Sequence, residues 1–284
     1  MISKGFSYAF LGALAWSGAI LCTRLVLQSG ENLYNVIFWA VLFSFPFWLL
    51  RFTRHTSELK ALTKKDYLIL LAMTLVSTLG ASLVEFFALK YTPAVNYSFL
   101  IRTVIPFTFI FAFFVLGEKF TFKKIFIASV LLIGAYLLAT NGKALSLSLG
   151  DFLTIFEAML IALGNNTLGK LASSRMSTGL NTSAIFLIGF LPAIVIMSIF
   201  GTIHWPQSIL FIVLIALCNI LLAQFRFTAY KNTSAAVVTM VFSFTPVFVS
   251  LLAIPFLGES LSVIQIVGGV LIVAGGVLVE ALKV

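Results

Sequence analysis

A long apolar stretch with an arginine and a proline inside it sets the strongest constraint on how this chain can fold. Residues 94–116 are predominantly apolar, contain Arg102 and Pro106, and are followed by Gly117-Glu118. About 20 helical residues at 1.5 Å each match a hydrocarbon core about 30 Å thick. A charge near the centre of that core costs at least about 2.5 to 3.5 kcal/mol, so Arg102 must face protein, water or a ligand.

The same pattern recurs in the second half of the chain. The segment from Ala88 reads ALKYTPAVNYSFLIRTVIPFTFIFAFFVLGE, and the segment from Ala229 reads AYKNTSAAVVTMVFSFTPVFVSLLAIPFLGE. Pro106 is matched by Pro246, and both copies end in LGE. Repetition on this scale indicates an internal duplication. We therefore expect two halves, residues 1–143 and 144–284, that form one integral membrane domain.

The rest of the chain has the composition of a polytopic membrane protein. Hydrophobic residues are 61% of the chain and charged residues 10%, whereas about a quarter of the residues in a soluble domain are charged. We predict an all-α membrane protein with ten transmembrane helices, at residues 5–26, 34–50, 67–89, 94–116, 122–140, 150–171, 182–203, 206–229, 234–257 and 263–282. Five spans per half is an odd number, so the second half enters from the opposite side. Two inverted five-helix repeats of this kind occur in secondary transporters.

The formal net charge of +9 is a topology signal and does not indicate a nucleic-acid partner. With the amino terminus in the cytoplasm, most basic residues fall on the cytoplasmic side, and the outer side keeps only Arg24, Lys90 and Lys143. The loops are short, so the positive-inside rule applies and predicts that both termini are cytoplasmic. We expect the cell inner membrane because the chain is short and has no obvious targeting extension.

The sequence has no signature of catalysis, of a cofactor or of a metal site. The motifs GxxxxGK[ST], HExxH and GxSxG are absent. Cys22 and Cys218 lie in different halves with no histidine nearby, which indicates neither a disulfide nor a metal site. We therefore expect no enzyme activity, and a membrane enzyme is the weakest alternative.

Four charged residues lie inside the expected spans: Glu85, Arg102, Glu157 and Arg226. Counted from the outer ends, Glu85 lies roughly 6 Å deep, Glu157 about 10 Å and Arg102 about 12 Å. An arginine between two carboxylates can be a structural network or a transport site. In a transport site, Arg102 would bind a substrate carboxylate, and a glutamate would receive an ammonium group or a coupling proton. Arg226 is nearer the cytoplasmic end, where we expect it to snorkel.

Other side chains on these spans complete the candidate substrate site: Trp16, Asn96, Tyr97, Asn165 and Asn166. Each polar one could instead form a hydrogen bond between helices, worth about 0.6 kcal/mol. Pro106 and Pro246 are candidate hinges, and simple helix kinks are the alternative.

The repeated pattern resembles the EamA-type family of the drug/metabolite transporter superfamily. It consists of AxxYTxA, an apolar helix with scattered polar residues, a proline in the middle of that helix, and LGE. Ala88 to Glu118 match it well, and Ala229 to Glu259 match it except at Lys231-Asn232-Thr233-Ser234. The resemblance covers essentially the whole chain. It implies ten helices in two halves around a central cavity lined by helices one, three, four, six, eight and nine. It also implies alternating access and export or exchange of small metabolites without ATP hydrolysis.

We therefore expect a secondary active transporter of small polar organic metabolites. Amino acids or related compounds are the first candidates, because an arginine and a glutamate together suit a zwitterion. A larger nucleotide-like metabolite, a drug, or a non-transporting membrane scaffold are the alternatives. The expected partners are a small-molecule substrate, a coupling proton and the lipid bilayer, and the sequence leaves open a monomer or a homodimer.

Overall fold

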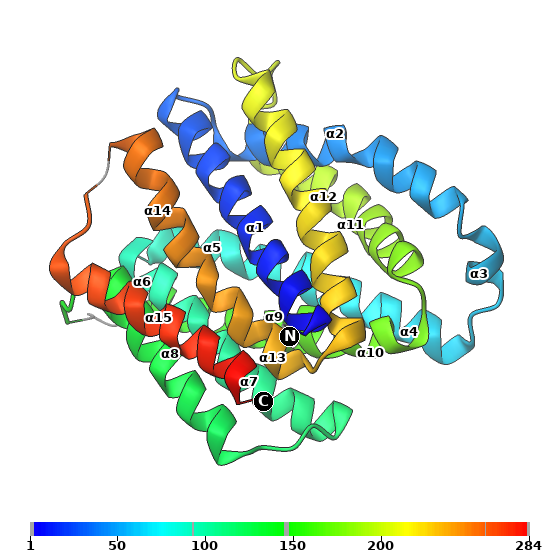
Figure 1. Cartoon of the computed structure of the whole chain (residues 1–284). Helices are drawn as coiled ribbons and strands as arrows, with labels where there is room; N and C mark the ends of the chain where they lie inside the picture. Colours follow the sequence, from blue (N-terminus) through cyan, green and yellow to red (C-terminus); the bar gives the residue numbers. More distant parts are fainter. Residues whose placement is uncertain (1–2, 93, 145–147, 259, 283–284) are drawn as a thin grey trace.

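The computed structural model describes residues 3–92, 94–144, 148–258 and 260–282, and all regular elements within these ranges are helices (Figure 1). The helices of the first half are α1 (Lys4–Gln28), α2 (Leu33–Thr53), α3 (Thr56–Lys60), α4 (Lys64–Met73), η1 (Thr74–Ala81), α5 (Ser82–Tyr91), α6 (Ala94–Leu100), η2 (Ile101–Thr103), α7 (Val104–Phe111), η3 (Ala112–Leu116) and α8 (Phe122–Thr140). Those of the second half are α9 (Leu149–Ile161), η4 (Ala162–Leu168), α10 (Gly169–Arg175), α11 (Thr178–Phe200), α12 (Ile209–Asn232), α13 (Ala235–Val241), η5 (Phe242–Phe244), α14 (Thr245–Leu257) and α15 (Val263–Ala281).

This is a multi-pass membrane protein. In the described residues, nine helical segments are long and apolar enough to cross a membrane. They are Lys4–Gln28, Leu33–Thr53, Lys64–Glu85, Asn96–Leu116, Phe122–Thr140, Leu149–Arg175, Ile209–Asn232, Ala235–Leu257 and Val263–Ala281. Each coincides with an expected span to within a few residues. The expected span 182–203 falls on α11, which adds the shorter apolar segment Thr178–Gly189. The count of ten helices and the inverted topology stay predictions.

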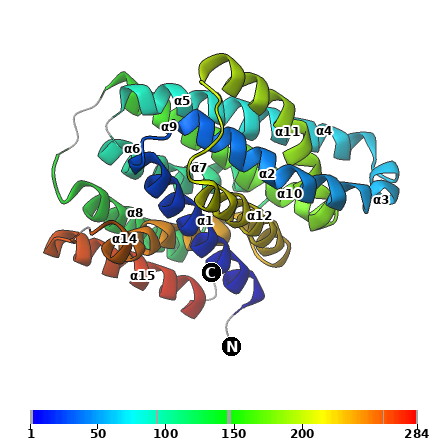
Figure 2. The same ribbon diagram turned by 90° about the horizontal axis from the view of Figure 1, so that it is seen from above.

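The two halves are interleaved and do not lie apart as separate bodies. The four most extensive helix contacts all join one half to the other: α1 with α12, α2 with α11, α5 with α9, and α8 with α15. Both views show α1 beside α12 and α8 beside α15 (Figures 1 and 2). Exchanging the halves converts the α1–α12 pair into the α9–α5 pair and leaves the other two unchanged. A two-fold relation between the halves, which stays a prediction, would give this pairing.

Helices α8 and α15 approach each other through glycines. A Cβ atom placed on Gly134 would lie 2.7 Å from the carbonyl oxygen of Gly268, and one placed on Gly268 would lie 2.6 Å from that of Gly134. Neighbouring Gly269 faces open space. Small residues allow such close contacts between membrane helices, so Gly268 is required by packing and Gly269 is not.

Matching features mark both copies of the repeated segment. Gly117 and Gly258 end their helices with φ of 68° and 67°, a left-handed conformation that glycine adopts without strain. Glu118 then crosses to the second half, where its carboxylate accepts hydrogen bonds from the backbone N–H groups of Ala235 at 2.7 Å and Ala236 at 3.4 Å. The LGE motif of the first copy therefore caps the start of α13. Its counterpart Glu259 lies outside the described residues, as do residues 145–147 of the link between the halves.

Each repeated helix also contains a tighter 3₁₀ turn just before its proline. These turns are η2, before Pro106, and η5, before Pro246. Proline has no N–H for the carbonyl four residues earlier, which is Arg102 in the first copy and Phe242 in the second. The helix therefore changes its hydrogen-bond pattern at the same place in both halves, and at both places the turn faces the interior.

Candidate functional site

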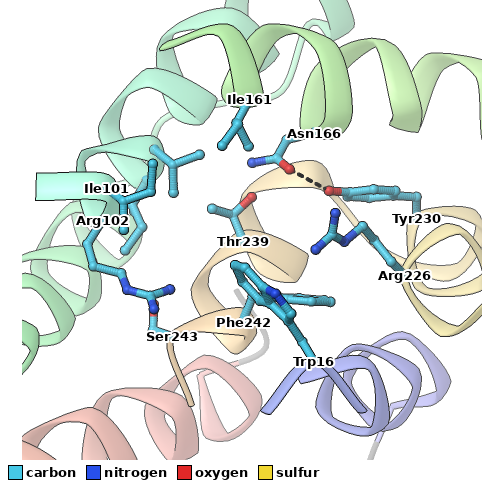
Figure 3. A pocket seen from close by; sticks show the side chains of 12 residues that line it. Trp16, Ile101, Arg102, Ile161, Asn166, Arg226, Tyr230, Thr239, Phe242 and Ser243 are labelled. Carbon is cyan, nitrogen blue, oxygen red and sulfur yellow. Dashed lines mark hydrogen bonds between the residues drawn. The ribbon is translucent and has the colours of Figure 1, made fainter. Parts of the chain in front are cut away.

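A cavity in the middle of the helix bundle collects the residues of greatest chemical interest (Figure 3). Its volume is about 50 Å³. The residues that line it come from α1, the α6–α7 region, α9, η4, α12, α13 and η5: Trp16, Ile101, Arg102, Val104, Ile105, Ile161, Asn166, Arg226, Tyr230, Thr239, Phe242 and Ser243. Both 3₁₀ turns contribute to this list, so the two halves meet at the cavity.

Two arginines face this cavity, and its described lining contains no acidic residue. The guanidinium carbon of Arg102 lies 5.9 Å from the centre of the Trp16 ring, and that of Arg226 lies 5.6 Å from the same ring and 4.7 Å from the Phe242 ring. A cation over an aromatic face is stabilised by about 0.5 to 2 kcal/mol. The rings therefore stabilise the two positive charges where no carboxylate does.

Polar atoms without a partner also face the cavity. The Nε atom of Arg102 and the Oγ atom of Ser243 are buried and have no hydrogen-bond partner among the described residues. Figure 3 shows these two side chains close together on one side of the cavity. A buried polar group without a partner costs about 1 to 3 kcal/mol, so a ligand that accepted hydrogen bonds here would recover that free energy.

The opposite side of the cavity is closed by a satisfied hydrogen-bond chain. The Tyr230 hydroxyl donates to Asn166 Oδ1 at 2.8 Å, and Asn166 Nδ2 donates to Thr108 Oγ1 at 2.8 Å. The Lys170 ammonium group donates to the backbone carbonyl of Tyr230. This chain fixes α12 against η4 and α7, and it gives Asn166 a structural role at the edge of the site.

The arginine–carboxylate network that we expected does not form in the described structure. Arg102 makes no ion pair there with Glu85 or Glu157, and neither glutamate lines the cavity. Glu157 instead contacts Tyr97, whose hydroxyl donates to Glu157 Oε1 at 2.9 Å.

Of the candidate substrate residues, Trp16, Arg102 and Asn166 line the cavity, and Glu85, Asn96, Tyr97, Glu157 and Asn165 do not. The Asn96 amide donates to Asp151 at 3.2 and 3.3 Å and joins α6 to the start of α9. Asn165 is half-buried beside Asn166. Pro106 is exposed and Pro246 half-buried, each just after its 3₁₀ turn.

Sequence reasoning missed the importance of Arg226 and Ser243. Arg226 points into the cavity and does not extend to the membrane surface (Figure 3). Ser243 matches Arg102 when the copies are aligned on the glycine of LGE, and neighbouring Phe242 matches it when they are aligned on the prolines. Alignment of the repeats could therefore have identified Ser243. No comparable signal existed for Arg226, because its depth does not show which way its helix face points.

A second cavity, of about 270 Å³, lies between α1, α2 and α12. Its lining includes Thr23, Arg24 and Asn219 with otherwise apolar side chains, and it shares Trp16 with the central cavity. Trp16 therefore borders both spaces. Next to it, the Ser17 hydroxyl donates to the backbone carbonyl of Ala13 at 2.7 Å and lies 3.2 Å from that of Thr245, so α1 packs beside the turn before Pro246.

Comparison with known proteins identifies both halves. The family model described as EamA-like transporter family matches residues 3–140 and again residues 148–280. An uncharacterized transporter of Clostridium kluyveri is 27% identical over 98% of this chain and 93% of its own length. A solved crystal structure has the same fold, with a TM-score of 0.74 over 96% of each chain at 15% sequence identity.

Proposed function

This chain belongs to the EamA-like transporter family, and on that premise we propose that it is a secondary transporter that moves small organic anions by alternating access. The observation on which this rests is the pair of arginines in a central cavity whose described lining has no carboxylate. A guanidinium group binds carboxylate and phosphate groups through two parallel hydrogen bonds. Arg102 and Arg226 together therefore suit an anion.

The proposed substrate class differs from a plain zwitterion. An amino acid would satisfy the arginines with its carboxylate, but its ammonium group would lie beside two positive charges. The glutamates that could have received it, Glu85 and Glu157, lie outside the lining. We therefore place carboxylates and phosphates with no ammonium group ahead of amino acids.

Alternating access is supported by three features around the cavity. The 3₁₀ turns η2 and η5 face it from opposite halves, and a mid-helix 3₁₀ stretch often marks a hinge. Pro106 and Pro246 follow these turns and are the proposed hinge points. Trp16 borders both the cavity and the space between α1, α2 and α12, and in this proposal its movement joins the two spaces. In this proposal both termini are cytoplasmic and the protein lies in the cell inner membrane.

A thermal-shift screen on detergent-purified protein tests the substrate class. The panel contains mono- and dicarboxylates, phosphate esters, nucleotides, amino acids, sugars and cationic drugs. A ligand at a hundred times its dissociation constant stabilises the folded state by about 2.7 kcal/mol. We expect stabilisation by organic anions in the wild type, loss of it in Arg102→Gln and Arg226→Gln, and retention of it in Arg54→Gln, which changes an exposed arginine outside the cavity.

Transport by the same proteins in liposomes decides the proposal. Stabilisation by amino acids or cationic drugs alone, or equal anion stabilisation in all three variants, would contradict an anion site at the two arginines. A nucleotide-like substrate is the second candidate, because the Trp16 and Phe242 rings beside Arg226 could stack on a base. Stabilisation by nucleotides that exceeds that by their phosphate groups alone would favour it.

A further inference from the structure

The second cavity, between α1, α2 and α12, is larger than the central one, and the proposed function gives it no ligand. Its volume is about 270 Å³, against about 50 Å³ for the central cavity. Most of its described lining is apolar, and the polar members are Thr23, Arg24 and Asn219. That described lining contains no acidic residue. The second cavity therefore combines space for an apolar body with a positive charge and an amide.

The two cavities follow each other along the same faces of α1 and α12. Arg226 lines the central cavity, and Asn219, seven residues earlier on α12, lines the second one. Residues seven apart lie on one face of a helix, about 10 Å apart along its axis. On α1, Trp16 and Thr23 have the same spacing and both line the second cavity. A ligand that moved along these faces would pass from one cavity to the other.

Contacts between α1 and α12 place Trp16 at the junction of the two cavities. A Cβ atom placed on Gly12 would lie 3.5 Å from the Cβ atom of Phe225. One placed on Gly18 would lie 3.1 Å from the Sγ atom of Cys218. The two helices therefore run antiparallel, and Trp16 is level with the part of α12 between those two contacts. That part of α12 joins the asparagine of the second cavity to the arginine of the central one.

The Trp16 ring is held from the side of the central cavity. The guanidinium carbons of Arg102 and Arg226 lie 5.9 and 5.6 Å from its centre. The Phe242 ring lies 6.1 Å from it, as Figure 3 shows. Trp16 is nevertheless only half-buried, whereas Trp48 is 2% exposed. The ring therefore contacts the two arginines and has space to move into the second cavity that it borders.

We propose that the second cavity is a separate binding position, which the substrate occupies before it reaches Arg102 and Arg226, and that the substrate is an organic anion with an apolar body. This inference rests on the proposed function. Arg24 attracts the anion, because a cleft lined by charge of one sign concentrates ions of the opposite sign. The Asn219 amide donates a hydrogen bond to the anionic group.

In this proposal, Trp16 is the gate between the two binding positions. Its ring lies over the guanidinium groups while the substrate is in the second cavity. A carboxylate or phosphate group binds a guanidinium group through charge-assisted hydrogen bonds, which are stronger than the attraction of a cation to an aromatic face. An arriving anion therefore takes the place of the ring at the two arginines, and the ring moves into the space that the anion has left.

The lining from α2 decides which anions fit best. Inorganic sulfate and phosphate have no apolar body to cover the side chains that α2 contributes, which are Val36, Ile37, Ala40 and Val41. Benzoate has both a negative charge and an apolar ring. Acetate has the charge without the ring, and benzyl alcohol has the ring without the charge. These three compounds are therefore the probes.

Labelling of introduced cysteines tests the proposal. In a background with Cys22→Ser and Cys218→Ser, Asn219→Cys reports on the second cavity and Thr239→Cys on the central one. A small anionic methanethiosulfonate that does not cross membranes is added to intact cells that express each variant. We expect Asn219→Cys to react at least about tenfold faster than Thr239→Cys, because a minor open state is populated at no more than about 10%. Leu217→Cys, on the exposed side of α12, is the matched control and should react slowly.

Benzoate should slow the labelling of Asn219→Cys at concentrations at which acetate and benzyl alcohol do not. Arg24→Gln should remove the preference of this cysteine for the anionic reagent over a cationic reagent of the same size. Arg54→Gln changes an exposed arginine outside both cavities and should keep that preference.

Two variants of Trp16 test the gate. Trp16→Leu keeps an apolar side chain but removes the ring that the arginines hold. It should raise the labelling rate of Thr239→Cys at least about tenfold, because the open state is then no longer a minor one. Trp16→Phe keeps a ring and should leave this labelling slow. Thermal melting of the purified variants shows whether each is folded.

The two proposals fail in different ways. If no organic anion stabilises the protein or slows labelling at either cysteine, the anion transporter is wrong, and this inference with it. If anions stabilise the protein but benzoate leaves the labelling of Asn219→Cys unchanged, or if Leu217→Cys reacts as fast, only the second binding position is wrong. Fast labelling of Thr239→Cys with Trp16 in place, or slow labelling in a folded Trp16→Leu protein, would overturn the gate.

Discussion

Replacing Gly268 by alanine should destabilise the protein, whereas the same replacement at the next residue should not. A Cβ atom on Gly268 would lie 2.6 Å from two backbone atoms of α8, the oxygen of Gly134 and the nitrogen of Leu138. Backbone atoms cannot rotate away as a side chain can, so α8 and α15 must separate along one of the most extensive contacts in the molecule. Gly269 has no atom within 4 Å of such a Cβ atom.

The magnitude follows from two opposing terms. Alanine is favoured over glycine inside a helix by about 0.8 to 1.0 kcal/mol, and this gain applies equally to both positions. Forcing an extra carbon into a packed contact costs about 1 to 3 kcal/mol, and the rigid backbone neighbours of Gly268 place it at the upper end. Gly268→Ala should therefore lose about 2 kcal/mol, and Gly269→Ala should gain up to about 1 kcal/mol. The difference of about 3 kcal/mol is the cleaner quantity, because the helix preference cancels.

Reversible unfolding of both variants in mixed micelles by increasing amounts of a denaturing detergent measures this difference. Gly134→Ala, on the other side of the same contact, should behave like Gly268→Ala, because its Cβ atom would lie 2.7 Å from the Gly268 oxygen. Equal stability of the Gly268 and Gly269 variants within about 0.5 kcal/mol would refute the close approach of α8 and α15 described above, since surface substitutions fall within that range.

Two further predictions concern carboxylates outside the cavity. Glu118→Ala should lower the free energy of unfolding by about 1 to 2 kcal/mol, because it removes the cap from the first N–H groups of α13. The control is Lys119→Ala, at the exposed neighbouring residue. In the same detergent titration it should change the free energy of unfolding by less than about 0.5 kcal/mol. The second prediction concerns Glu31, in the loop before α2. Burial alone would raise the pKa of its carboxyl group. Hydrogen bonds from the Gln207 backbone N–H and the Asn35 amide, together with nearby His204, hold this pKa below its usual value. A lowered pKa stabilises the folded state above the unfolded pKa of about 4.3, and this stabilisation is lost as the pH falls through the folded value. At neutral pH, Glu31→Gln should therefore have a lower melting temperature than the wild type. On acidification, its melting temperature should fall by less than that of the wild type. An equal fall in melting temperature for both proteins would contradict this assignment.

The course of the chain through the membrane is readable from the sequence because it depends on one-dimensional quantities. Apolar length fixes where each span begins and ends, and the duplication fixes which segments correspond. Pro106 and Pro246 mark the same place in both copies, and each follows a 3₁₀ turn that the sequence did not predict beyond a hinge or kink. All these features depend on residues close together along the chain.

The site is less readable because it depends on the direction in which each helix face points. Arg226 was expected to snorkel, yet its side chain turns into the cavity. Arg102 and Glu157 have similar expected depths, yet one lines the cavity and the other turns to Tyr97. Successive helical residues differ by about 100° in direction, so a small change in helix rotation exchanges an interior position for a lipid-facing one. Contacts between distant helices set this rotation.

The pairing of helices across the two halves also has a consequence for how the protein is made. Helix α1 finds its main partner in α12, and α8 finds its main partner in α15. A chain inserted into the membrane from its amino terminus must therefore hold its early helices in lipid without their final neighbours until most of the remaining chain has been synthesised. Their packing surfaces, including Gly134, stay open to other membrane proteins throughout that interval. If the second half is supplied as a separate polypeptide, its helices α12 and α15 should pack against α1 and α8 of the first half, because these contacts do not require a covalent link between the halves.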